Sequence, residues 1–171
     1  MSTKTNIDAE FAYGSGQINP IKAAAPGLVY DITEADFVSF LCGQGYNTTT
    51  LRRITGDNSS SCTKANKATV WDLNYPSFAV SAKSGQVTRV FHRTVTNVGN
   101  PVSTYKATVT APPQLSIQVN PITLSFKSLG QKLSFSVTVT AEIPRTIISG
   151  SLVWDDGVHQ VRSPVVAHSY A

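Results

Sequence analysis

The side chains that could carry out proton transfer in this chain are three histidines, accompanied by many serines and a few carboxylates. Catalysis by a serine nucleophile needs a strained serine, a histidine that accepts its proton and a carboxylate that orients the histidine. His92 falls in the middle of an expected strand, His159 lies on the strand expected after a hairpin, and His168 is near the C-terminus. We interpret all three as surface or cross-strand side chains, so the sequence offers no catalytic residue.

Two other local patterns could be mistaken for chemical sites. The Gly14-Ser15-Gly16 turn is shorter than the G-x-S-x-G nucleophile elbow and lacks its strand-to-helix context. Asp155-Asp156 followed by His159 offers metal-ligand types, but adjacent residues on a tight turn point apart and no further ligand is suitably spaced. We therefore predict a turn here, with no metal and no cofactor.

Composition excludes other classes of function. Only 14% of the residues are charged, well below the usual quarter, and the net charge is +4. The basic residues are scattered, with Arg52-Arg53 the closest pair, and no basic cluster is interleaved with aromatic residues, so nucleic acid is not an expected partner. No apolar stretch is long enough to span a membrane, so no membrane association is expected.

Cysteine and asparagine positions indicate a secretory compartment. Cys42 and Cys62 belong to no C-x-x-C pair, and a disulfide between them would contribute on the order of 3 kcal/mol; two buried free thiols are the alternative. N-glycosylation sequons begin at Asn47 and Asn58, inside the same region. Residues 1–16 nevertheless lack the apolar core of a signal peptide, which suggests that an N-terminal portion is missing.

The first seventy residues predict short helices. Asn19-Pro20 reads as an N-cap followed by proline at the first helical position, and 28–30 as a brief extended segment. Thr33 and Asp36 resemble a capping box that begins a helix running to about Gly43. A second helix is expected over 48–54, ended by Gly56, and 57–68 is expected to be an exposed loop.

From residue 77 onward the periodicity changes to two, which is typical of half-buried strands. Leu133, Phe135, Val137 and Val139 alternate with polar residues, and about seven or eight such strands fit between Ser77 and His168. Asp156-Gly157 favours a hairpin. The predicted fold class is mainly β, a fibronectin- or immunoglobulin-like antiparallel sandwich, although the immunoglobulin Cys–Trp–Cys pattern is absent.

Six stretches carry a resemblance to a known family over essentially the whole chain. They are FAYGSGQINP at 11–20, PGLVYD at 26–31, FLCGQGY at 40–46, DLNYPS at 72–77, RTVTNVG at 93–99 and GSLVWDDG at 150–157. In combination they resemble the C-terminal part of plant subtilisin-like serine proteases of the cucumisin type. The resemblance implies that 1–31 ends a subtilisin-like α/β protease domain, 32–70 is a helical connector and loop, and 71–171 is a fibronectin type III-like sandwich.

The resemblance also implies what this chain does. The family's catalytic Asp, His and Ser lie upstream of the part represented here, so the chain is expected to be a non-catalytic portion that supports the fold and activity of the protease domain. That domain is the expected partner, in cis or after cleavage, and protein substrates belong to the parent enzyme only. The expected location is extracellular, in the plant apoplast or cell wall. Apolar surface without a partner is expected around Phe11, Tyr13, Ile18 and Val29.

Two alternatives remain open at this point. The chain could be a stand-alone secreted binding or regulatory protein built on the sandwich, which predicts a soluble monomer ordered from its first residues. An unrecognised small hydrolase is the other, and it requires that His92, His159 or His168 be catalytic. The protease-like stretch at 11–31 favours the subtilisin-like hypothesis, because a free-standing module has no reason to carry it.

Overall fold

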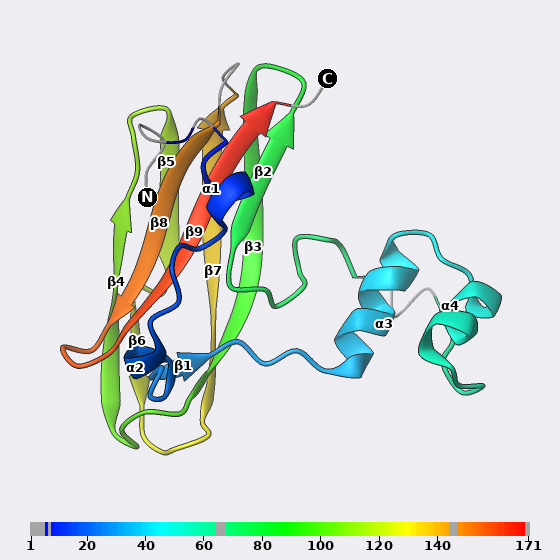
Figure 1. Cartoon of the computed structure of the whole chain (residues 1–171), viewed down its shortest axis with the longest axis horizontal. Helices are drawn as coiled ribbons and strands as arrows, with labels where there is room; N and C mark the ends of the chain where they lie inside the picture. The colour runs from blue at the N-terminus through cyan, green and yellow to red at the C-terminus, as the bar shows by residue number, and fades with distance from the viewer. Residues whose placement is uncertain (1–5, 7, 64–67, 144–146, 170–171) are drawn as a thin grey trace.

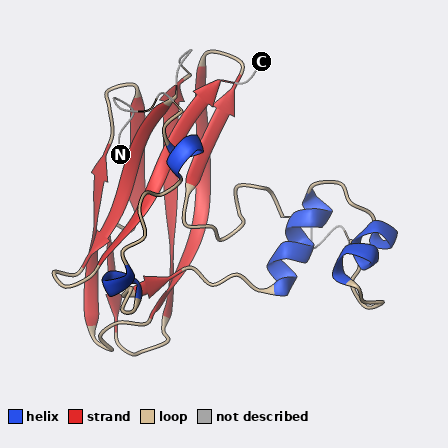
Figure 2. Cartoon of the chain, in the orientation of Figure 1, coloured by secondary structure: helices blue, strands red, loops and turns tan. Residues whose placement is uncertain are grey.

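The structure is a computed structural model that describes residues 6, 8–63, 68–143 and 147–169. Its strands form two facing sheets, and its helices lie outside them (Figures 1 and 2). The mainly β, two-sheet architecture expected from the sequence is confirmed. Among the described residues, no helix is both long and apolar enough to cross a membrane.

The first sheet has four strands in the order β1-β3-β7-β5, and all of its neighbours are antiparallel. Its strands are β1 (Leu28–Val29), β3 (Gln86–Asn97), β7 (Lys132–Glu142) and β5 (Leu115–Asn120). The β3–β7 pairing is the longest in this sheet and runs from Gln86 opposite Glu142 to Thr96 opposite Lys132.

The second sheet has five strands in the order β2-β9-β8-β4-β6. Its strands are β2 (Phe78–Ala82), β9 (Gln160–Ser169), β8 (Ile148–Asp155), β4 (Ser103–Thr110) and β6 (Thr123–Phe126). Only the edge pair β2–β9 is parallel, while the pairs joining β9, β8, β4 and β6 are antiparallel. Strands β2 to β9 number eight, within the range that the periodicity predicted.

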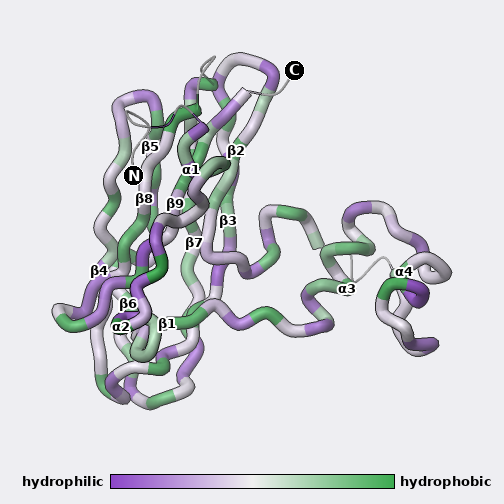
Figure 3. Tube along the Cα trace, in the orientation of Figure 1, coloured by the Kyte–Doolittle hydropathy of each residue, from purple (hydrophilic) through white to green (hydrophobic). Residues whose placement is uncertain are grey.

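The core lies between the two sheets because each strand directs alternate side chains inward. Hydrophobic and hydrophilic residues are accordingly mixed along the strands (Figure 3). On β7, Phe135, Val137 and Val139 are buried, as their spacing predicted. Trp154 of β8 is fully buried and meets the ring of Phe135 edge-on, with 5.0 Å between the ring centroids.

The helices have the caps that the sequence predicts. The side chain of Asn19 accepts a hydrogen bond from the Lys22 N–H and begins α2 (Pro20–Ala23). Thr33 and Asp36 form the capping box of α3 (Glu34–Gly43). Helix α4 (Thr48–Thr55) ends at Gly56, which adopts the left-handed conformation at φ 73°. A further short helix is α1 (Glu10–Tyr13).

The N-terminal segment runs along the outer face of the five-stranded sheet before it enters the sandwich (Figure 1). Phe11 meets His168 edge-on at 5.0 Å, and Nη1 of Arg162 donates a hydrogen bond to the Ser15 carbonyl at 3.3 Å. Leu28 is buried in the core. The expectation of exposed apolar surface holds at Phe11 but is wrong at Val29, because β1 pairs with β3 and half-buries that side chain.

Candidate functional site

The structure separates the three histidines and gives each a structural partner. His92 lies exposed on β3, with Nδ1 3.3 Å from Oδ1 of Asp72. His168 is close to the end of β9, and its Nδ1 lies 3.1 Å from the carbonyl oxygen of Ser169. His159 is in the loop between β8 and β9, not on the strand as predicted. These partners are carboxylates, a carbonyl and an aromatic ring, which position an imidazole but supply no nucleophile.

The Asp156–His159 pair closes the β8–β9 hairpin. Oδ1 of Asp156 accepts hydrogen bonds from the N–H groups of Val158 at 2.9 Å and His159 at 2.6 Å, and Oδ2 lies 3.0 Å from Nδ1 of His159. Burial raises the pKa of Asp156, but the His159 and Val158 hydrogen bonds outweigh it and lower that pKa to about 2. No group of three or more potential metal ligands occurs among the described residues, and the geometry is that of a satisfied turn.

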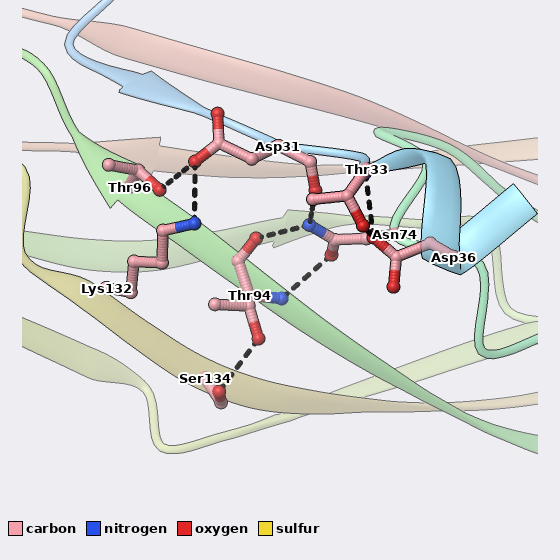
Figure 4. A network of polar contacts seen from close by, with 8 residues as sticks. All are labelled: Asp31, Thr33, Asp36, Asn74, Thr94, Thr96, Lys132 and Ser134. Carbon is pink, nitrogen blue, oxygen red and sulfur yellow. Dashed lines mark hydrogen bonds and ion pairs between the residues drawn. The ribbon is translucent and has the colours of Figure 1, made fainter.

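A network of polar side chains joins the connector to the sandwich (Figure 4). Its centre is Asn74, whose Nδ2 donates to the carbonyl oxygens of Asp31 at 2.9 Å and Thr94 at 2.8 Å. The Oδ1 atom of Asn74 accepts the Thr94 N–H at 2.8 Å, so one amide bridges two segments far apart in sequence. The side chains drawn together in Figure 4 are those of Asp31, Thr33, Asp36, Asn74, Thr94, Thr96, Lys132 and Ser134.

Asp31 supplies the charge in this network. Its Oδ2 accepts a hydrogen bond from Oγ1 of Thr96 at 2.5 Å and lies 3.2 Å from Nζ of Lys132. The Thr96 hydroxyl, followed by Lys132, holds the pKa of Asp31 below its ordinary value. The surrounding groove has a volume of about 530 Å³, and its Asp, His, Thr and Lys side chains are largely committed to each other. The arrangement fastens the chain at residue 31 to β3 and β7.

Arg93 fastens the chain where it returns from the helical connector to the sandwich. Its side chain is buried on β3, where Nε donates to the carbonyl oxygen of Tyr75 at 2.8 Å and Nη1 to that of Trp71 at 2.6 Å. The guanidinium also lies over the Phe78 ring, 5.0 Å from its centroid. Burial lowers the pKa of Arg93 to about 10, so the group remains a cation at neutral pH.

The sequence motif at 93–99 contains Arg93 and Asn97, but their structural roles were not predicted from it. Asn97 is fully buried; its Nδ2 donates to the Asn100 carbonyl at 2.7 Å and its Oδ1 accepts the Gly99 N–H at 3.1 Å. The alternation of inward and outward residues along 91–95 could have indicated a buried role for Arg93, because it lies between the inward-facing Phe91 and Val95. A cation placed among core positions must find several acceptors.

The helical connector contains the expected disulfide and both sequons. Cys42 and Cys62 are joined by an S–S bond of 2.04 Å. Asn47 is exposed and caps α4, with Oδ1 accepting the Thr50 N–H at 2.9 Å, which leaves its Nδ2 outside that bond. Asn58 is also exposed. Beside it, Asp57 accepts hydrogen bonds from Ser60, and the Ser60 hydroxyl is the chief cause of its lowered pKa.

Apolar side chains without cover gather in the N-terminal segment. Ile18 is 87% exposed, Ile21 is 89% exposed and Phe11 is 60% exposed, whereas Tyr13 is half-buried. These exposed apolar side chains lie within eleven residues of one another in the sequence.

Comparison with known proteins identifies the class first. The family model of the fibronectin type-III domain matches residues 72–167, and the chain belongs to that family. This span begins at the motif around Asn74, includes β2 to β8 and covers β9 up to residue 167. The sandwich and its two fastening residues, Asn74 and Arg93, are therefore parts of a fibronectin type-III module.

The full chain is similar to a particular group of proteins that contain such a module. Subtilisin-like protease SBT4.14 of Arabidopsis thaliana is 49% identical over 99% of this chain and 23% of its own length. Subtilisin-like protease SBT4.6 of the same plant is 47% identical over 98% of this chain and 23% of its own length. The resemblance to plant subtilisin-like proteases is confirmed, and the chain spans less than a quarter of these relatives.

A solved structure shows a weaker likeness. The VesB protease of Vibrio cholerae aligns with a TM-score of 0.37 and 17% identity, over 56% of this chain and 31% of that one. A likeness of this size has no bearing on function.

Proposed function

We propose that this chain is the non-catalytic C-terminal portion of a secreted subtilisin-like serine endopeptidase, where it supports the fold and activity of the protease domain. The observation that carries the proposal is the 49% identity with a subtilisin-like protease over 99% of the chain, including the stretch before the sandwich. The three histidines have structural partners, which supports a role outside the chemistry.

The N-terminal segment supports contact with the protease domain. Ile18 and Ile21 project from the segment around α2 with almost no cover, while Leu28, a few residues later, is part of the sandwich core. A rigid sandwich would thus present an apolar segment to a neighbouring domain. We propose that residues 1–31 complete the packing of that domain, 32–70 form a connector, and 71–171 act as the supporting module.

The connector supports a secretory location. A disulfide closes it, and disulfides persist in oxidising compartments. Asn47 and Asn58 are exposed on its surface, so we propose that both carry N-linked glycans on a protein of the plant apoplast or cell wall. Protein substrates would belong to the parent enzyme, and this chain needs no cofactor for the role proposed.

Complementation tests this function. Subtilisin-like protease SBT4.14, truncated before the region matching this chain, is mixed with the purified chain, and hydrolysis of a peptide substrate is measured. We expect activity to rise when the chain is added. The variant Ile18→Ser/Ile21→Ser should keep the stability of the parent, because both side chains are exposed, yet restore less activity.

The outcomes separate the proposed function from the alternative. Failure of the chain to bind the truncated protease, with the chain itself folded, would contradict support in trans. The stand-alone secreted binding protein then becomes the better explanation. Its specific support is that Leu28 and β1 are integral to the sandwich, which lets the chain fold without a partner.

A further inference from the structure

Residues 33–63, called the helical lobe below, stand to one side of the sandwich (Figures 1 and 2). The lobe contains α3, α4 and the turn around Asp57. Its fully buried apolar side chains are Cys42 and Leu51. The sandwich core, by contrast, takes no described residue between Asp31 and Val70. The lobe therefore has a core of its own, and that core is very small.

Besides the disulfide, hydrogen bonds join the segment at 60–62 to α4. The N–H of Cys62 donates to Oγ1 of Thr48 at 3.1 Å, and Nε of Arg52 donates to the Ser60 carbonyl at 2.9 Å. Helix α3 has 10 residues and α4 has 8, and isolated helices of this length are marginal in water. One covalent bond thus links the end of α3 to the segment that packs on α4.

We propose that the Cys42–Cys62 disulfide is a redox-sensitive latch, whose reduction unfolds the helical lobe while the sandwich stays folded. In this step a dithiol reductant gives two electrons and two protons to the disulfide. The S–S bond breaks, two thiols form, and the reductant is itself oxidised to a disulfide. Without the covalent link, the unfolded segment between the two cysteines gains the conformational freedom that the disulfide had removed, which favours unfolding of the lobe.

Reduction also changes the exposure of a dibasic pair. Arg52 and Arg53 lie within α4, where the helical backbone and the Arg52–Ser60 hydrogen bond keep the chain out of an extended conformation. Proteases that act after basic residues bind an extended backbone, in the manner of an added strand. The unfolded lobe would offer this pair for cleavage, at a point enclosed by the two cysteines.

Two optical signals distinguish the lobe from the sandwich. Trp71 and Trp154 both lie outside the lobe, so tryptophan fluorescence follows the sandwich. Most of the described helical residues lie inside the lobe, since α1 and α2 have only 4 residues each.

The full chain is treated with a phosphine reductant, and its thiols are titrated. Circular dichroism at 222 nm is then compared with the thermal transition measured by tryptophan fluorescence. We expect most of the helical signal to disappear and the fluorescence transition to remain.

Limited trypsin digestion gives an independent readout. The reduced chain should be cut after Arg52 or Arg53 about tenfold faster than the oxidised chain, because cleavage follows the population of the open form. A Cys42→Ser/Cys62→Ser variant should behave like the reduced chain with or without reductant, and Arg52→Gln/Arg53→Gln should remove the new cut.

Two results would overturn the latch. One is a chain with both thiols titrated that keeps its 222 nm signal and its resistance to trypsin. The other is loss of the fluorescence transition together with the helices, which would mean that the lobe and the sandwich unfold as one unit.

Discussion

Nη1 of Arg93, on β3, donates a hydrogen bond of 2.6 Å to the main-chain carbonyl oxygen of Trp71. The same guanidinium donates a hydrogen bond to the carbonyl of Tyr75, so one buried cation holds the segment at 71–75 that precedes β2. This relationship explains why a strand of the sandwich carries an arginine in an inward position. The charge is matched by several main-chain carbonyl oxygens, which accept charge-assisted hydrogen bonds from the guanidinium.

Replacing Arg93 should therefore destabilise the sandwich strongly. Arg93→Met removes the donors and leaves carbonyl oxygens unsatisfied, so we expect the free energy of unfolding to fall by about 2–4 kcal/mol. Urea denaturation followed by tryptophan fluorescence measures this. The control is Arg89→Met, which loses the stacking contact with the Trp71 ring and an exposed hydrogen bond to the Thr88 carbonyl, and should cost less than about 1 kcal/mol. Equal stability of the two variants would refute this role.

Asp156 should make the stability of the chain depend on pH in the acid range. Its pKa in the folded protein, about 2, lies below the ordinary 3.8, so the folded state favours the ionised carboxylate. The resulting stabilisation is present above pH 4 and is lost as the pH falls from about 4 to about 2, by up to about 2 kcal/mol. Asp156→Asn should lower the free energy of unfolding at pH 7 and weaken its dependence on pH between about 4 and about 2. Asp8→Asn, at an exposed position, should leave the stability at pH 7 unchanged. An acid limb unchanged in Asp156→Asn would contradict the assignment.

Gly27 should tolerate no side chain, because its neighbours leave no space. A Cβ at Gly27 would lie 2.6 Å from Cβ of His159 and 2.7 Å from the Tyr105 hydroxyl, at a φ of +80°. Gly130 has a similar φ of +76° but open space around it. Gly130→Ala should cost about 1–2 kcal/mol from backbone strain alone. Gly27→Ala should cost about 1–3 kcal/mol more, from overpacking. Thermal unfolding of the pair measures the difference, and equal midpoints would show that the site has room.

Glycosylation of the connector can be tested without disturbing its fold. Asn47→Asp keeps an oxygen that caps α4 but removes the nitrogen to which a glycan attaches, and Thr49→Ala removes the sequon while leaving the cap intact. On secretion from a plant or other eukaryotic cell, each variant should migrate as if one glycan were lost. Asn58→Gln should lose a second. If treatment with an N-glycosidase leaves the migration of the parent chain unchanged, the sites are unoccupied.

Much of the local structure could be predicted from short stretches of sequence. The alternation of Leu133 through Val139 predicted β7, and the caps at Asn19 and Thr33 predicted where two helices begin. These signals are local, because side-chain direction in a strand and the free N–H groups of a helix depend on neighbours a few residues away. The resemblance to subtilisin-like proteases was equally readable, since it rests on ordered motifs.

Partner choice between strands was not readable in the same way. β5 and β6 follow each other along the chain but belong to different sheets, and β2 pairs in parallel with the last strand, β9. His159 was placed on a strand, yet the demands of the turn hold it beside Asp156. The polar partners of Asn74 and Arg93 were hidden for the same reason, because they come from segments remote in sequence.

The sequence by itself determined the class of the protein, the positions of most elements and the kinship with plant subtilisin-like proteases. Tertiary structure alone decided that Leu28 belongs to the sandwich core, that Asp31 and Arg93 fasten the connector from both sides, and that the helical lobe has a core of its own. The physical reason is that periodicity and capping are properties of a few adjacent residues. Burial and polar pairing depend on which distant segments the two sheets bring together.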